Sequence, residues 1–138
     1  MKAIVQYAYS SPDVLEFKEV DKPAIKDDEV LLRVRAGAVN WGDCALLRGV
    51  PYMLRLAYGL RRPRTAVQGR DVAGQVEAVG KGVTQFRPGD EVYAEVSTGS
   101  FAEYACASED LLGPKPVNLT FEQAAAVPLA ATTALQGL

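Results

Sequence analysis

Short stretches with the residue pattern of β-strands, separated at close intervals by turn residues, constrain the fold of this chain more than any other feature. Along residues 29–39, apolar side chains alternate with Arg33 and Arg35, which is the period of two expected for a half-buried strand. Arg87-Pro88-Gly89-Asp90 has Pro and Gly at the central positions of a type II turn. Strands are predicted over residues 2–8, 14–20, 29–39, 72–79, 91–96 and 101–107. The chain is therefore expected to be mainly β with short helices, as a small antiparallel barrel or sandwich.

Two regions depart from this pattern. Between Arg48 and Arg70 the chain has six arginines and no acidic residue, and we expect a loop or short helix lying on the barrel. This stretch could attract an anionic substrate or cofactor phosphates, or it could be an ordinary solvated face. Near the C-terminus, Thr120 and Gln123 form a capping box, which predicts the start of a helix. Pro128 must end or kink that helix.

The C-terminal segment has no charged residue from position 123 to position 138. A helix without a polar face is not expected on the surface of a soluble domain, so we expect further protein to cover it. This predicts that the chain is part of a longer protein. Residues 1–122 would form one domain, and residues 123–138 would begin the connection to a second domain.

Composition excludes several classes of function. The 138 residues include no histidine and two cysteines, which excludes Ser-His-Asp and Cys-His catalysis, histidine-containing metal sites and a disulfide framework. A net charge of -2 argues against nucleic acid or an anionic membrane as a partner. No apolar run reaches the roughly 20 residues that span a bilayer. We expect a soluble cytoplasmic protein with one hydrophobic core.

One polar cluster and one glycine pair are candidates for chemistry. Asn40 and Asp43 follow the third predicted strand, and Asp43 is placed at the N-cap of a short helix. They are either a strand end with a helix cap or the polar groups of a site at the mouth of the barrel. Gly80-Lys81-Gly82 lacks the third glycine of a phosphate-binding turn and is interpreted as a hairpin turn.

Four motifs occur in the order typical of one known family, at residues 36–43, 69–80, 86–93 and 99–104. In these four motifs, the chain resembles the N-terminal GroES-like domain of the medium-chain dehydrogenase/reductase superfamily, in its zinc-independent, quinone-oxidoreductase-like branch. Residues 124–136 resemble the crossover helices of that family. The resemblance implies a partly open β-barrel whose last helices lead to a Rossmann domain that is not among these residues.

The resemblance also implies an activity. Relatives with zinc have a Cys-x-x-Asp ligand motif and a Gly-His-Glu motif, where this chain has Asn40 and Arg70. An amide and a guanidinium do not make a zinc site, so no metal site is expected. The implied function is NADPH-dependent reduction of quinones or activated C=C and C=O groups by hydride transfer. The full-length protein is expected to be a homodimer, and this chain alone is expected to have negligible activity. The alternative is a GroES-like binding or assembly module without catalysis.

Site residues are implied by the same resemblance. Asn40 is expected to donate to the nicotinamide or the substrate, and Asp43 to orient Asn40 or to cap the helix. Tyr52 or Tyr58 would donate to the oxyanion that develops on the substrate. Each of these side chains could instead serve only the local backbone or the core.

Two further implied positions concern the cofactor and the cleft. Thr133 is expected to contact the nicotinamide, with Thr132 taking this role if the register is shifted by one. Arg70 and Asp71 are expected to form a buried or half-buried ion pair that supports the cleft. Quinones, enones, enoyl thioesters and aldehydes all remain open as substrates.

Overall fold

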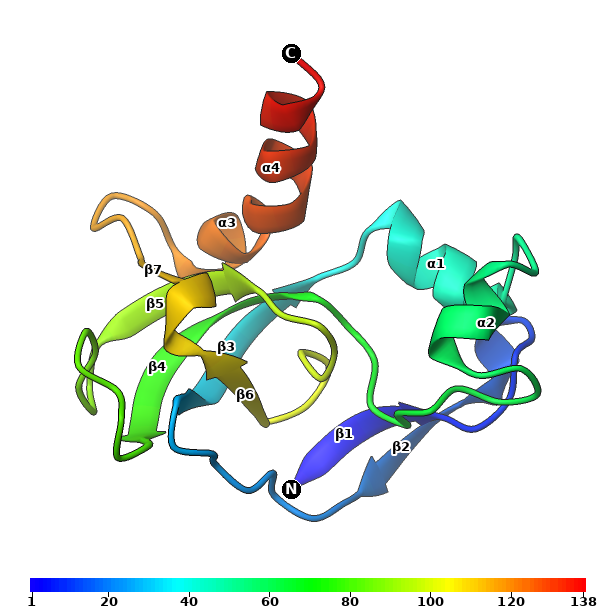
Figure 1. Cartoon of the computed structure of the whole chain (residues 1–138), viewed down its shortest axis with the longest axis horizontal. Coiled ribbons are helices and arrows are strands. Elements are labelled where there is room, and N and C mark those ends of the chain that lie inside the picture. The colour runs from blue at the N-terminus through cyan, green and yellow to red at the C-terminus, as the bar shows by residue number, and fades with distance from the viewer.

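The computed structural model describes all residues from Met1 to Leu138 and contains two antiparallel sheets with four short α-helices (Figure 1). The smaller sheet pairs β1 (Lys2–Gln6) with β2 (Leu15–Glu19). The larger sheet has the strand order β6-β3-β4-β5-β7. Its members are β3 (Glu29–Ala38), β4 (Asp71–Val79), β5 (Glu91–Glu95), β6 (Tyr104–Ser108) and β7 (Leu112–Pro114). The prediction of a mainly β chain with short helices is confirmed.

The six predicted strands are present, with shifted ends. The last of them was predicted to begin at Phe101 but begins at Tyr104, because Ala102 instead forms an isolated bridge to Ala3 of the smaller sheet. The seventh strand, β7, was not predicted, because three residues are too few to show a periodic pattern. The predicted type II turn is confirmed: Gly89 has a φ of 100°, and the Asp90 N–H donates to the Arg87 carbonyl at 3.1 Å.

The core lies on both faces of the central strand β4. On one face, Val72 and Val76 are buried against apolar side chains of β3 and β5, among them Leu32 and Val92. On the other face, Ala73 contacts two alanines of α3 (Phe121–Ala125). Because strand side chains alternate between faces and both faces of β4 are covered, its first four residues are all buried.

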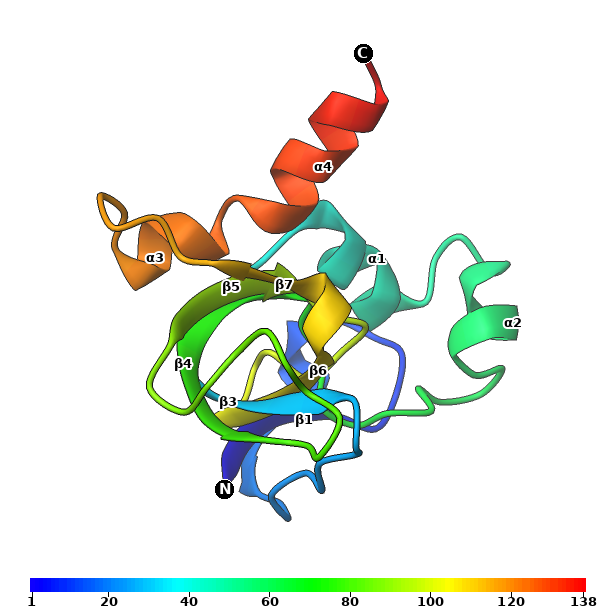
Figure 2. The same cartoon turned by 60° about the vertical axis from the view of Figure 1, so that its left-hand side comes forward.

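The C-terminal helices begin where the local signals predict. The Gln123 N–H donates to Thr120 Oγ1 at 3.2 Å, and the Thr120 N–H donates to Gln123 Oε1 at 3.0 Å, which completes the capping box of α3. Pro128 then begins a separate helix, α4 (Pro128–Gln136), which projects away from the sheets (Figure 2). Residues 130–138 are exposed. The longest helix has nine residues, and none has the length and apolarity to cross a bilayer.

The remaining helices, α1 (Trp41–Arg48) and α2 (Leu54–Tyr58), lie beside the end of the β1–β2 sheet (Figure 1). The turn at Gly80 is held by the backbone. The Gly80 N–H donates to the Glu29 carbonyl and the Gly82 N–H donates to the Asp27 carbonyl, both at 2.8 Å. These N–H groups are therefore not free to hold a phosphate, in agreement with the interpretation of this segment as a turn.

Candidate functional site

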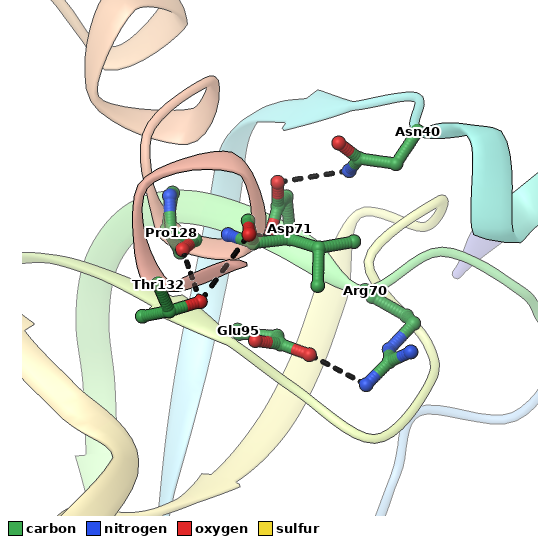
Figure 3. Close-up of polar contacts among 7 residues, drawn as sticks. Asn40, Arg70, Asp71, Glu95, Pro128 and Thr132 are labelled. Carbon is green, nitrogen blue, oxygen red and sulfur yellow. Dashed lines mark hydrogen bonds and ion pairs between the residues drawn. The ribbon is translucent and has the colours of Figure 1, made fainter. Parts of the chain in front are cut away.

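Three strand ends meet at one edge of the larger sheet. β3 ends at Ala38, β4 begins at Asp71 and β5 ends at Glu95, and Asp71 is the register partner of both other residues. Asn40 follows Ala38 by two residues, so the antiparallel pairing places it beside Asp71. The start of α4 approaches the same edge, and polar groups of four segments meet there (Figure 3).

Asn40 is the N-cap of α1, with an extended backbone at φ -115° and ψ 166°. Asp43 is the third residue of this helix, and its Oδ2 accepts from the Asn40 N–H at 2.7 Å. The prediction that Asp43 is the N-cap is therefore wrong by three residues. Both side chains are of types that bind free N–H groups in the first turn of a helix, so the residue types alone did not distinguish the two positions.

Asp71 joins two distant parts of the chain and is fully buried, with 0% of the residue exposed. Its Oδ2 accepts from Asn40 Nδ2 at 2.9 Å, and its Oδ1 accepts from the Leu129 N–H at 3.1 Å. Leu129 is the second residue of α4, where the preceding Pro128 has no N–H and Val127 provides no side-chain cap. Asp71 therefore caps α4 from β4, a role that nothing in the local sequence indicates.

Arg70 forms its ion pair with Glu95, through Nη2 and Oε1 (Figure 3). The predicted Arg70–Asp71 pair is wrong, because side chains of consecutive residues in extended backbone point in opposite directions. Arg70 Nε is buried without a hydrogen-bond acceptor, and Asp43 Oδ1 is buried without a donor.

Burial raises the pKa of both Asp43 and Asp71 above the ordinary value of 3.8. Hydrogen bonds to each carboxylate from Asn40 oppose this increase in pKa, and the positive charge of Arg70 lowers the pKa of Asp43. The charges of Glu95 and Asp43 raise the pKa of Asp71 further. Two carboxyls with raised pKa at one sheet edge are a feature of candidate functional sites.

A groove of about 640 Å³ runs beside this cluster. Arg70 and Glu95 border it at the strand ends, and Pro128 and Thr132 border it from α4. The Thr132 hydroxyl donates to the Pro128 carbonyl of its own helix at 2.7 Å, as Figure 3 shows. Thr133 is exposed on α4, one helical turn beyond Leu129.

Comparison with known proteins shows the family. Residues 26–117 match the alcohol dehydrogenase GroES-like domain. The chain belongs to this family. The resemblance to the medium-chain dehydrogenase/reductase superfamily and to its quinone oxidoreductases is thereby confirmed.

Curated relatives of this GroES-like domain include reductases. The NADPH-dependent alkenal/one oxidoreductase of Arabidopsis thaliana chloroplasts is 41% identical over 148 residues, which cover 100% of this chain and 37% of that protein. The quinone oxidoreductase of Sus scrofa is 39% identical over 141 residues, covering 100% and 40%. The solved structure of the quinone oxidoreductase from Coxiella burnetii superposes with a TM-score of 0.88 at 31% identity, covering 100% and 44%. The chain thus spans about two-fifths of the length of these relatives.

The two candidate tyrosines of this GroES-like domain lie in different surroundings. Tyr52 follows the C-terminal end of α1, is 71% exposed and has its ring 4.8 Å from the Arg55 guanidinium. α1 is about 12 Å long and lies between Tyr52 and Asn40, so the structure does not bring these two residues together. Tyr58 lines a pocket of about 200 Å³ that Arg70 also borders.

The acidic and thiol side chains of the GroES-like domain form no metal-binding cluster. No group of three or more His, Cys, Asp or Glu side chains lies close enough together to hold a metal ion. Of the predicted site residues, the structure gathers Asn40, Asp43 and Asp71 at the sheet edge, with the start of α4. Sequence reasoning missed Glu95, although it is the last residue of β5 and lies one residue before the end of the predicted strand.

Proposed function

We propose that this chain is the substrate-facing domain of an NADPH-dependent reductase that transfers hydride to quinones or to activated C=C and C=O groups. The observation that carries this proposal is the polar cluster of Asn40, Asp43 and Asp71 at the strand ends. The neighbouring Arg70–Glu95 pair borders a groove that α4 also borders. The names of the alkenal/one and quinone oxidoreductases among the relatives support the same reaction class.

We infer that the reductase works without zinc. At the positions where zinc-dependent relatives are expected to have a thiolate and an imidazole, this chain has the amide of Asn40 and the guanidinium of Arg70. Neither group is a ligand for zinc, and a permanent positive charge disfavours a cation beside it. The residues present do not fit a zinc ion, and no step of the proposal requires one.

The residues at the sheet edge fit the nicotinamide end of NADPH. The Asn40 amide offers a donor and an acceptor that match a carboxamide, and the Thr133 hydroxyl lies exposed on the neighbouring helix. The phosphates need a binding site elsewhere, because the glycine turn at residues 80–82 uses its N–H groups internally. When bound, NADPH supplies the hydride.

This chain's own groups would bind and polarise the acceptor. Hydride addition to a carbon conjugated with a carbonyl leaves negative charge on the carbonyl oxygen, which then needs hydrogen-bond donors. Arg70 and Tyr58 line one pocket and are the candidate donors, whereas Tyr52 lies beyond α1. Water or a nearby acid supplies the proton that completes the reduced product.

The uncharged helix α4 leads us to infer a second, nucleotide-binding domain. Residues 123–138 carry no charge, and Leu135 is 74% exposed. Covering this helix with a Rossmann domain would bury its apolar side chains and place the cofactor beside Asn40. We expect the 138-residue chain alone to have negligible activity. The cytoplasmic location and the homodimer of the whole protein remain predictions, which fractionation and light scattering would check.

The test is an assay of the protein encoded by the whole reading frame, with NADPH oxidation followed against a quinone, an enal, an enone and an aldehyde. We expect turnover that metal chelation leaves unchanged and that Asn40→Ala lowers by about 100-fold. Asn118→Ala is the matched control, since Asn118 is the second asparagine and is exposed. Absence of turnover with every acceptor would contradict the reductase, and loss of activity on chelation would contradict its zinc-free mechanism.

A further inference from the structure

Asp71 determines which way the side-chain amide of Asn40 faces. A carboxylate has acceptors and no donor, so only the NH₂ group of Asn40 can face it. The Nδ2–Oδ2 distance of 2.9 Å fits this arrangement, and Figure 3 shows the Asn40 oxygen directed away from Asp71. Rotating the amide by half a turn would bring two oxygens together. Asp71 therefore excludes the reversed orientation of Asn40.

The same carboxylate holds the first free N–H of α4. The Leu129 N–H donates to Asp71 Oδ1 at 3.1 Å, and neither Val127 nor Pro128 caps the helix. A negative group at this end of a helix is also favoured by the helix dipole. Thr133 lies one turn further along α4. One buried side chain thus connects Asn40 at the strand ends with the helix that carries Thr133.

We propose that Asp71 is a positioning residue for cofactor binding, acting through Asn40 and through the start of α4. This inference rests on the proposed function, in which Asn40 and Thr133 contact the nicotinamide. If both groups were free to move, binding would have to order them, and this ordering would lower the affinity. Asp71 orders both before the cofactor arrives.

The first experiment uses the 138-residue chain without any cofactor. Only Asn40 and Asn118 are asparagines, so selective ¹⁵N-asparagine labelling gives two side-chain amide signals in an NMR spectrum. We expect the Asn40 amide protons to exchange slowly with solvent and to exchange faster in Asp71→Ala, which removes the acceptor and adds no asparagine signal. The exposed Asn118 amide is the internal control and should stay unchanged. Equal exchange of Asn40 in both chains would overturn the proposed orientation by Asp71.

The second experiment uses the whole protein and measures NADPH affinity and melting temperature in parallel. In Asp71→Asn, one amide must serve two N–H neighbours with a single acceptor, so one of the two contacts is lost. The exchanged pair, N40D with D71N, regains both: the residue-71 amide accepts from Leu129 and donates to the residue-40 carboxylate. We expect about ten-fold weaker NADPH binding in D71N. In the exchanged pair we expect the melting temperature to recover while NADPH binding stays weak, because a carboxylate at position 40 cannot donate to the nicotinamide.

The outcomes separate this inference from the proposed function. If D71N lowers the melting temperature but leaves NADPH affinity unchanged, Asp71 is structural only and the inference is wrong. If the exchanged pair restores NADPH affinity together with the melting temperature, the Asn40 amide is not the group that Asp71 positions for the cofactor, and the inference is also wrong. If the unsubstituted protein binds no NADPH, the proposed function and the cofactor role inferred from it both fail, while the amide-exchange experiment still decides whether Asp71 orients Asn40.

Discussion

The two ends of helix α1 are stabilised in opposite ways. At its N-terminal end, Asn40 donates its backbone N–H to Asp43 and its side-chain amide to the buried Asp71. At its C-terminal end, Gly49 adopts a left-handed conformation with φ 62°, and Arg55 Nε donates to its carbonyl at 2.9 Å. Carboxylates thus satisfy N–H groups at one end, and a guanidinium satisfies carbonyl groups at the other.

The partners of these two ends differ in burial and in distance along the chain. Asp71 lies 31 residues from Asn40 and connects it to β4 and, through Leu129, to α4. Arg55 follows Gly49 by six residues, and its guanidinium lies 4.7 Å and 4.8 Å from the rings of Tyr9 and Tyr52. Buried charge is costly unless it is fully paired, whereas a partly exposed arginine keeps some hydration. The N-terminal end therefore has the features of a functional site and the C-terminal end those of a stabilising cap.

The largest expected effect is that of removing the carboxylate from the N-terminal end. Asp71→Ala leaves the Asn40 amide and the Leu129 N–H without an acceptor, and we expect the free energy of unfolding to fall by about 3 kcal/mol. Urea unfolding of the chain measures this. Asp21→Ala, at an exposed position, should change the free energy by less than about 0.5 kcal/mol. Equal effects of the two substitutions would contradict the importance of the buried contacts.

A substitution of Gly49 tests the C-terminal end directly. An added Cβ would lie 2.6 Å from Arg55 Nε and 2.7 Å from Tyr9 Cγ, at a φ that side chains disfavour. We expect Gly49→Ala to lower the free energy of unfolding by about 2 kcal/mol.

Gly42 offers a matched control in the same helix, because nothing lies within 4 Å of its added Cβ. Gly42→Ala should raise the free energy of unfolding by up to about 1 kcal/mol, since alanine favours the helical conformation. If both alanines had the same sign of effect, the left-handed cap would not matter to stability.

Removal of Arg55 should have a smaller effect. Arg55→Ala loses the contact with the Gly49 carbonyl and the contacts with two aromatic rings, and we expect a loss of about 1.5 kcal/mol in thermal or urea unfolding. Arg61→Ala in the same arginine-rich stretch is exposed and should change stability little. Equal losses would mean that the arginines act together as one charged face, not that Arg55 acts as a cap.

The smallest expected effect concerns pH at the N-terminal end. Burial raises the pKa of Asp43 above 3.8, so the folded chain binds a proton at a pH where the unfolded chain has released it. The quantity to compare is the difference in free energy of unfolding, the unsubstituted chain minus Asp43→Asn. This difference should increase as pH falls from neutral through the raised pKa. The increase should end below 3.8. A difference that instead decreased over this range would show that the Asn40 N–H and Arg70 outweigh burial.

Local signals explain how far the sequence predicted the fold. The turn at residues 87–90, the capping box at residues 120–123 and the break at Pro128 each depend on a few neighbouring residues. Their backbone preferences do not need a partner from elsewhere in the chain. The alternation along β3 similarly indicated its buried face, with Val30 and Leu32 both at 0% exposure. The order of the six longer strands and of the C-terminal helices could therefore be derived before any tertiary structure was known, whereas the three-residue β7 could not.

The partners at the site depended on tertiary structure. Asn40 was singled out because it ends a strand before a helix, but its contact with Asp71 requires the register of β3 against β4. Likewise, whether Arg70 pairs with Asp71 or with Glu95 depends on which way each side chain points and on which strand is its neighbour.

The sequence by itself therefore determined the β-rich architecture, the helix starts at the C-terminus and the position of Asn40 at a strand end. Only the tertiary structure decided that Asp71 links Asn40 to Leu129. Asn40 precedes Asp71 by 31 positions, and Leu129 follows it by 58. The physical reason is that backbone preferences act over a few residues, whereas the pairing of a buried carboxylate depends on strands and helices brought together by the whole fold.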